Sequence, residues 1–205
     1  NSKGYLKKKN VILTGNPVRK EIHLMDIIEA KQFYNFDPSR PVLAILGGSQ
    51  GSIPFNRHFQ NNVKKYIDSN IQILWQCGER DFSNLNDLNK HQDVHIMPFS
   101  DNMNVFYSAA DLIVSRAGAL AISEMALLGK AMVLIPLPYS AGNHQAINAQ
   151  TFSQRGGAVM VDQALLASGA LEQVALELLQ NSQKIALMEK YSKNIGIPNA
   201  TKNIT

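Results

Sequence analysis

The 205-residue sequence has one cysteine, Cys77, and no spacing typical of a metal site. A single cysteine cannot form an intramolecular disulfide, which fits a reducing compartment such as the cytoplasm. The five histidines are scattered outside any HExxH motif, and there is no cysteine pair for zinc. We therefore expect a protein that uses neither a metal ion nor another cofactor.

Long apolar runs are also missing. No run reaches the length that spans a bilayer, and no signal peptide is recognisable. The net charge of +4 is spread out apart from Lys7–Lys9, a run that either contacts an anionic membrane surface or forms a solvated linker. Aromatic and basic residues do not interleave, so we expect no nucleic-acid partner. The chain begins without Met, which indicates a piece of a longer protein.

Short, continuous apolar runs recur along the chain. With 45% apolar and 18% charged residues, the sequence can bury a sizeable core and is not typical of disorder. Helix-length segments separate the runs, which predicts a doubly wound α/β fold with a mostly parallel, Rossmann-like sheet covered on both faces. The predicted strands are 11–13, 42–46, 71–75, 94–97, 112–114, 132–135 and 158–161.

Turn signals and amphipathic segments divide the chain. An amphipathic stretch runs from Lys20 to about Phe33, a turn-rich linker covers 35–41, and only helices follow from Leu171, with Pro198 as a break before a last short helix. We predict an interdomain segment with a first strand and helix at 1–35, a nucleotide-binding Rossmann-like domain at 36–195, and a helical tail at 196–205.

The loop Gly47–Gly51 follows a predicted strand and opens a helix, a position where doubly wound folds bind ligands. Its glycines allow close backbone approach to a phosphate at the helix N-terminus. The same residues fit the GxSxG nucleophile elbow of a hydrolase, with Ser49 as nucleophile and Asp111 and His144 downstream. A tight turn without ligand is the third interpretation. Because a nucleophile elbow normally follows several strands and only one run precedes Val42, binding is favoured over hydrolysis.

The segment 115–126 follows another predicted strand and opens a helix that is apolar on nearly every side up to Gly129. Glu124 is the only charged residue between Arg116 and Lys130. A buried carboxylate is costly without partners. Glu124 could accept hydrogen bonds from two ribose hydroxyls, or it could pair with Arg116 or cap backbone. Arg116 is either a diphosphate ligand or a structural partner.

Two further turns carry polar side chains after strands. Asn143, His144 and Gln145 follow a proline-rich loop, and their amide and imidazole groups suit sugar hydroxyls, although a loop histidine can also be merely exposed. Arg19 lies in the turn 14–19 and is either a phosphate ligand or a surface charge.

Taken in order, these motifs resemble the MurG family of UDP-N-acetylglucosamine transferases, which complete lipid II in bacterial peptidoglycan synthesis. The ordered set covers nearly the whole chain. It consists of Thr14–Arg19, Gly47–Gly51, Ser115–Ala119, Ser123–Glu124 and Asn143–Gln145 with Asn148–Ala149. The resemblance implies the carboxy-terminal, donor-binding half of a GT-B glycosyltransferase that needs no metal.

The resemblance also implies roles for individual residues. Arg19 and Ser49 would contact the diphosphate, the backbone of Ser100 would meet uracil, and Glu124 would bind the ribose hydroxyls. Gln145 would bind sugar hydroxyls, with His144 and Asn143 as further sugar contacts. The substrate-binding set is completed by Arg116 and by the stretch Ala119, Leu120, Ala121, Ile122 and Ser123, which would wrap phosphate and ribose.

The sequence departs from the family at two of these positions. Members often carry Thr at Ala121, so that a backbone N–H must replace its hydroxyl, and some carry Gln at His144. By the resemblance, the acceptor lipid I, the proposed base histidine and the membrane contact belong to an amino-terminal half that this chain lacks. We therefore expect no catalytic residue here, an inactive isolated chain, and a parent that is a peripheral enzyme of the cytoplasmic membrane face.

Three other functions are compatible with the sequence. The chain alone could act as a binding module that holds a UDP-sugar without turning it over. Alternatively, it could be the donor-binding half of a related GT-B transferase with another lipid or natural-product acceptor. A serine hydrolase using Ser49 is the third possibility.

Overall fold

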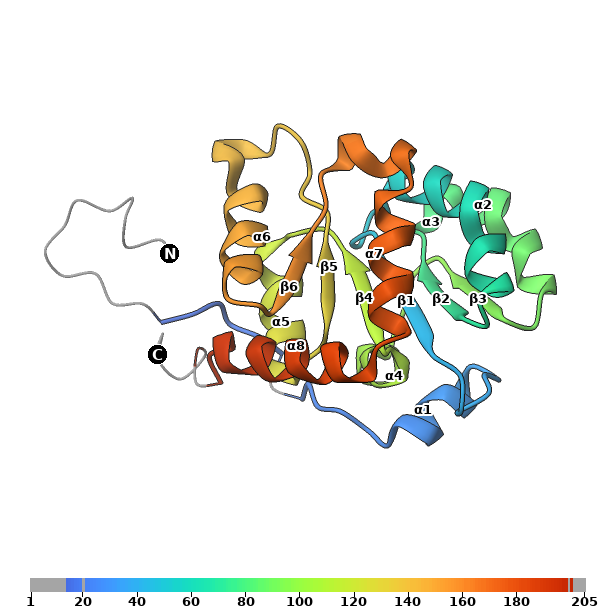
Figure 1. Cartoon of the computed structure of the whole chain (residues 1–205), viewed down its shortest axis with the longest axis horizontal. Helices are drawn as coiled ribbons and strands as arrows, with labels where there is room; N and C mark the ends of the chain where they lie inside the picture. The colour runs from blue at the N-terminus through green and yellow to red at the C-terminus, as the bar shows by residue number, and fades with distance from the viewer. Residues whose placement is uncertain (1–13, 20, 199, 201–205) are drawn as a thin grey trace, which may run out of the picture.

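The fold is a three-layer α/β/α sandwich around one parallel sheet (Figure 1). The computed structural model describes residues 14–19, 21–198 and 200. Six parallel strands lie in the order β3-β2-β1-β4-β5-β6, the arrangement of a Rossmann fold. The strands are β1 Val42–Leu46, β2 Gln72–Gln76, β3 Val94–Met97, β4 Leu112–Ser115, β5 Met132–Leu134 and β6 Ala158–Met160. The predicted doubly wound α/β fold is confirmed.

Strand β1 shows why the apolar runs are continuous. Its five residues are all buried, because side chains alternate between the two faces and helices cover both. Leu43 and Ile45 point into one apolar cluster, whereas Val42, Ala44 and Leu46 point into the other. The strand ends agree with the sequence prediction to within one residue for all six described strands.

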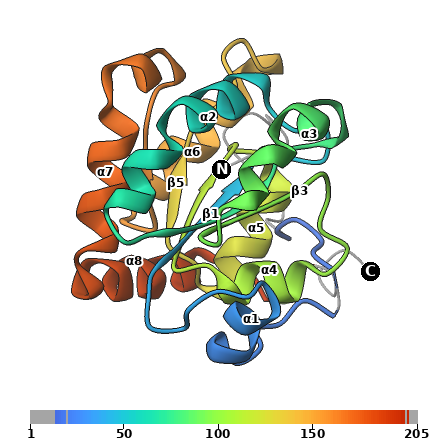
Figure 2. The same ribbon diagram turned by 90° about the vertical axis from the view of Figure 1, so that its right-hand side faces the viewer.

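One face of the sheet is covered by α2 (Ile53–Asp68) and α7 (Ala170–Leu179), which lie in front of the strands in Figure 1. Their core includes Phe59, whose ring centroid lies 5.9 Å from that of Tyr66 and 5.9 Å from that of Trp75. Helix α3 (Glu79–Leu85) and the 3₁₀ segment η2 (Asn86–Lys90) extend this layer beside β2 and β3 (Figure 2).

The opposite face carries α4 (Met103–Ala109), α5 (Ala119–Leu128) and α6 (His144–Gln154), with α1 (Ile27–Phe33) packed on α4. Helix α5 ends at Gly129, which adopts the left-handed conformation at φ 70°. Segments η3 (Ala141–Asn143) and η4 (Gln163–Ser168) precede α6 and α7. Helix α8 (Ser182–Ile195) contacts both α5 and α7 and so joins the two layers (Figure 1).

The predicted helical stretch from Lys20 to Phe33 is longer than the helix observed. Helix α1 begins at Ile27, because the Asp26 carboxylate accepts hydrogen bonds from the amides of Ile28 and Glu29 and caps the N-terminus. The amides of His23 and Met25 instead donate to side chains of α4. The predicted strand 11–13 lies outside the described residues. None of the helices that the structure describes is long and apolar enough to cross a membrane.

Candidate functional site

The candidate site lies where the parallel strands end. The loops after β1, β3, β4 and β5 all leave the sheet at this carboxyl edge, which is where doubly wound folds bind ligands. These loops contain, in turn, the glycine motif 47–51, Ser100, the segment 116–118 and the segment 135–143.

The glycine loop folds into a tight turn against the end of β2. The amide of Gly51 donates to the carbonyl of Gly48 at 3.1 Å, and both glycines have positive φ values of 71° and 88°. A Cβ on Gly51 would lie 2.0 Å from the carbonyl oxygen of Cys77, so only glycine fits there. Ser49 at the tip of this turn is exposed.

Helices α2 and α5 begin at the carboxyl edge, after the adjacent strands β1 and β4, without a side-chain cap. Neither Ser52 before α2 nor Gly118 before α5 makes a side-chain capping hydrogen bond. The N–H groups of the first turn therefore face outward with the positive end of the helix dipole. Two uncapped N-termini in adjacent loops can bind an anion such as a diphosphate.

Glu124 lies in the second turn of α5 and is paired with Arg19. Arg19 Nε donates to Oε1 at 2.8 Å and Nη2 donates to Oε2 at 3.1 Å. The hydroxyl of Tyr107, on α4, donates to Oε2 at 3.0 Å. The Glu124 side chain is 10% exposed and that of Arg19 is 55% exposed. The sequence analysis gave an ion pair with Arg116 as one structural alternative to ribose binding. That pairing is wrong, because the arginine that pairs with Glu124 is Arg19.

The charges at this pair shift two pKa values upward. The hydrogen bond to the Glu124 carboxylate is the main reason that the pKa of Arg19 is raised. Burial, together with the negative charge of Glu124, raises the pKa of Tyr107 far above its ordinary value. The Tyr107 hydroxyl therefore stays protonated and acts as a donor to the carboxylate.

Arg116 is a structural centre of the carboxyl edge. Nη1 donates to the carbonyls of Ile135 and Pro136, and Nη2 donates to Ser52 Oγ at 2.9 Å and to Gln163 Oε1 at 2.6 Å. Its guanidinium also lies 4.4 Å from the centre of the Phe55 ring. Burial lowers the pKa of Arg116 to about 10. Arg116 thus links the start of α2, the loop after β5 and η4, and its role as a diphosphate ligand stays a prediction.

The predicted sugar contacts lie at the start of α6. Gln145 Oε1 accepts from the amide of Leu137 at 2.9 Å, and His144 Nδ1 lies 2.6 Å from the carbonyl oxygen of Ala141. Asn143 has a positive φ of 53° and, like His144, is exposed. Asn148 donates to the carbonyl of Ala117 and so ties α6 to the loop before α5.

Ser100 and the first turns of α5 complete the predicted set. Ser100 is buried, and its amide donates to Gln76 Oε1 at 3.0 Å. In α5, Leu120 is 60% exposed and Ile122 only 2%. The others, Ala119, Ala121 and Ser123, are partly exposed.

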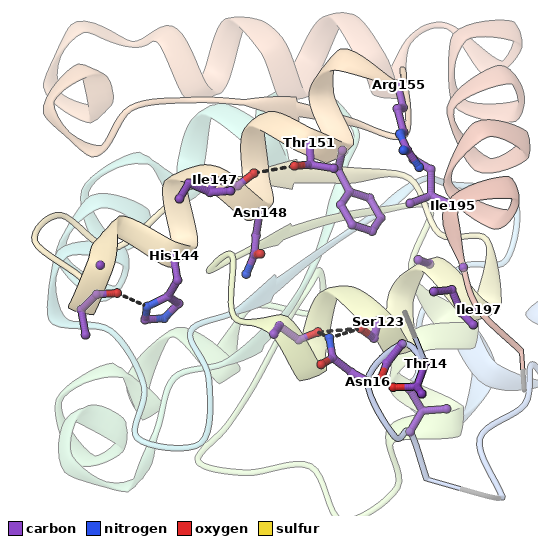
Figure 3. Close-up of a pocket in the computed structure, with 18 residues that line it drawn as sticks. Thr14, Asn16, Ser123, His144, Ile147, Asn148, Thr151, Arg155, Ile195 and Ile197 are labelled. Carbon is purple, nitrogen blue, oxygen red and sulfur yellow. Dashed lines mark hydrogen bonds between the residues drawn. The ribbon is translucent and has the colours of Figure 1, made fainter. Parts of the chain in front are cut away.

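A cavity of about 620 Å³ lies beside this site, between α5, α6, the segment 14–18 and the end of α8. Figure 3 shows Asn16 directed toward Ser123 on one side of the cavity and His144 on another. Asn16 Nδ2 donates to Ser123 Oγ at 3.0 Å. The cavity holds Ala119, Ser123 and His144 of the predicted set, whereas Arg19, Ser49 and Glu124 lie outside it.

The hydrolase interpretation of Ser49 fails on geometry. Asp111 precedes β4, where its carboxylate accepts from the amide of Val42 at the start of β1 and pairs with Lys31 Nζ at 2.8 Å. Ser49 follows the other end of β1, one strand length of roughly 15 Å away at about 3.3 Å per residue. Asp111 thus cannot orient a histidine beside Ser49, and no Ser-His-Asp triad forms.

Two polar residues at the site, Gln76 and Tyr107, escaped the sequence analysis, and a third, Asn16, lay in the motif Thr14–Arg19 without a role of its own. Gln76, at the end of β2, donates to the carbonyl of Gly48 and accepts from Ser100, and so links two loops. Tyr107, on α4, donates to Glu124. Asn16, near the start of the described residues, donates to Ser123. The position of Gln76 at the end of an apolar run could have indicated it, whereas nothing in the sequence distinguishes Tyr107 from the other residues of an apolar helix.

Within the described part of the chain, no group of three or more His, Cys, Asp or Glu could hold a metal ion.

The six-stranded parallel sheet with helices on both faces defines a Rossmann-like domain of the kind found in GT-B glycosyltransferases. Residues 42–204 match the family model described as the glycosyltransferase family 28 C-terminal domain. The chain belongs to this family.

Similar proteins of known name and a solved structure support the assignment to this family. The chain is 35% identical over 206 aligned positions to a UDP-N-acetylglucosamine--N-acetylmuramyl-(pentapeptide) pyrophosphoryl-undecaprenol N-acetylglucosamine transferase of Flavobacterium psychrophilum, covering 100% of the chain and 56% of the relative. It is 36% identical to the protein of the same name from Cytophaga hutchinsonii, covering 95% and 53%. The crystal structure of Acinetobacter baumannii MurG matches with a TM-score of 0.72 and 26% identity, covering 97% of this chain and 56% of that one. The chain thus spans about half the length of the relatives that it matches.

Proposed function

We propose that this chain is the donor-binding half of a transferase that moves N-acetylglucosamine from UDP-N-acetylglucosamine to lipid I in peptidoglycan synthesis. The observation that carries the proposal is the pairing of Arg19 with a buried Glu124 beside two uncapped helix N-termini. These groups match the charges of a nucleotide diphosphate sugar, in which anionic phosphates lie next to a ribose diol. The names of the similar relatives support the choice of donor and acceptor.

Donor binding would rearrange the charged pair. We expect Arg19 to leave Glu124 for the diphosphate, which carries more negative charge, and Glu124 to accept from the two ribose hydroxyls. The uracil would meet the Ser100 backbone. The sugar would lie near Gln145, His144 and Asn143, over the mouth of the cavity.

The chemistry assigned to this half is stabilisation of the leaving group. In inverting transfer, the 4-hydroxyl of N-acetylmuramic acid attacks C1 of the donor while the bond from C1 to the UDP oxygen breaks. The departing UDP gains negative charge, which the N-termini of α2 and α5 and Arg19 would stabilise. Ser49 and the α5 residues 119–123 would supply further phosphate contacts. Arg116 would act by holding these loops in place.

The acceptor side and the base belong, in this proposal, to the other half of the longer protein. A base must reach the acceptor hydroxyl, and GT-B enzymes form that site in the cleft between two domains. The lipid-linked acceptor would place the whole enzyme peripherally at the cytoplasmic face of a bacterial membrane. We expect this chain alone to bind the donor but to transfer no sugar.

Isothermal titration calorimetry with UDP-, GDP- and TDP-sugars tests the proposed function. We expect binding of UDP-N-acetylglucosamine to exceed that of the other two nucleotides, and Glu124→Gln to weaken it by about 1.5–3 kcal/mol, roughly 10- to 150-fold, because a charged acceptor is lost. The matched control is Glu172→Gln, which changes another buried carboxylate on α7, in the other layer. Equal binding of all three sugars, or equal losses in both variants, would refute the proposal.

A further inference from the structure

The side chain of Tyr107 holds the carboxylate of Glu124 from the side opposite to solvent. Tyr107 is 1% exposed, and its ring packs in the core of the layer formed by α1, α4, α5 and α6. Its hydroxyl donates to Glu124 Oε2 at 3.0 Å across two neighbouring helices. The bond is thus between a fixed aromatic side chain and the one acidic group of α5.

The two donors to Glu124 differ in how firmly they are held. The Arg19 side chain is 55% exposed and reaches Glu124 from a segment outside the sheet. The Tyr107 ring is fixed by the core and has no comparable freedom. If one donor leaves when a ligand binds, Arg19 is therefore the one that can move.

A carboxylate that loses Arg19 still needs a donor on its buried side. A glutamate side chain has three rotatable bonds, and the free energy of fixing them must come from a contact. Tyr107 supplies that contact at Oε2, and it leaves Oε1 and the remaining lone pairs of Oε2 open toward the carboxyl edge. A diol needs this arrangement, because its two hydroxyls donate to the two oxygens of one carboxylate.

We propose that Tyr107 is a positioning residue for ribose recognition: it fixes the Glu124 carboxylate in the orientation that accepts a vicinal diol. The inference rests on the proposed function, since it assigns how the same site distinguishes a ribose from a sugar without hydroxyls. Tyr107 itself touches no ligand in this account and acts through Glu124.

The test compares UDP with 2′,3′-dideoxy-UDP by calorimetry on the 205-residue chain and its Tyr107→Phe variant. The wild-type chain should prefer UDP by about tenfold or more. Tyr107→Phe should reduce that preference at least threefold while binding of the dideoxy nucleotide stays within about twofold. Loss of structure would weaken both nucleotides alike, so the ratio separates positioning from folding.

Tyr66→Phe is the matched control. Tyr66 is equally buried, in the opposite layer, and its hydroxyl has no hydrogen-bond partner among the residues that the structure describes. Its removal should leave the preference for UDP unchanged. An unchanged ratio in Tyr107→Phe, or equal weakening of both nucleotides, would overturn the role of Tyr107 alone. A wild-type chain that binds both nucleotides equally, or binds neither, would overturn the proposed ribose site and this inference with it.

Discussion

At the scale of single residues, Arg116 shows how one side chain can tie several loops of a site together. Its guanidinium bridges Ser52 at the start of α2, the loop after β5 and Gln163 after β6. The five N–H donors of an arginine allow such multiple contacts, and a lysine could not reproduce their planar geometry. The carboxyl edge is therefore held together by a half-buried arginine.

We expect Arg116→Met to destabilise the fold by about 2–3 kcal/mol, because the carbonyls of Ile135 and Pro136 lose their half-buried donor while the apolar stem is kept. Urea unfolding followed by circular dichroism measures the change. Arg57→Met, which removes an exposed arginine from α2, should cost less than about 0.5 kcal/mol. If the two variants unfold at the same urea concentration, Arg116 does not hold the loops.

The sequence indicated a specific role for Glu124 but did not identify the side chains that bind its carboxylate. A lone carboxylate in an apolar helix indicates a specific role, since burial without a partner is too costly. Which groups would meet it depends on the tertiary fold, because Arg19 is 105 residues away and Tyr107 is 17. Helical spacing can pair only residues three or four positions apart. The proposal of a pair with Arg116 therefore had no physical basis beyond proximity in sequence.

At the scale of elements, strands were predictable and the start of α1 was not. Apolar runs of four or five residues locate a strand because both faces are covered. Residues 21–26 also have apolar side chains at intervals that suit a helix. Their backbone instead bonds to Asn104 and Ser108 on α4, contacts that periodicity cannot show.

The glycine loop gives a prediction about an element. Gly51→Ala should destabilise the fold by more than about 3 kcal/mol, because its Cβ would overlap the Cys77 carbonyl and its φ is 71°. Gly48→Ala, in the same loop, shares the positive φ but has no atom within 4 Å of the new Cβ, so about 1 kcal/mol is expected. Chemical denaturation of both variants measures the difference. Equal costs would show that the contact with Cys77 does not constrain the loop.

At the scale of the whole molecule, the order of six parallel strands gathers short motifs from distant parts of the chain at one edge. Each motif alone could also be explained as a structural feature that binds no ligand. The order of the motifs along the sequence indicated the family. At this edge Arg19 and Ser49 are exposed, whereas Glu124 is buried.

The central claim is that this half binds a UDP-sugar with Glu124 on the ribose. A crystal structure of the chain with UDP-N-acetylglucosamine tests it most directly. We predict the ribose hydroxyls within hydrogen-bonding distance of Glu124, Tyr107 still bonded to Oε2, Arg19 turned to the diphosphate, and the phosphates at the N-termini of α2 and α5. A nucleotide bound elsewhere, or one bound while the Arg19–Glu124 pair stays intact, would contradict the account.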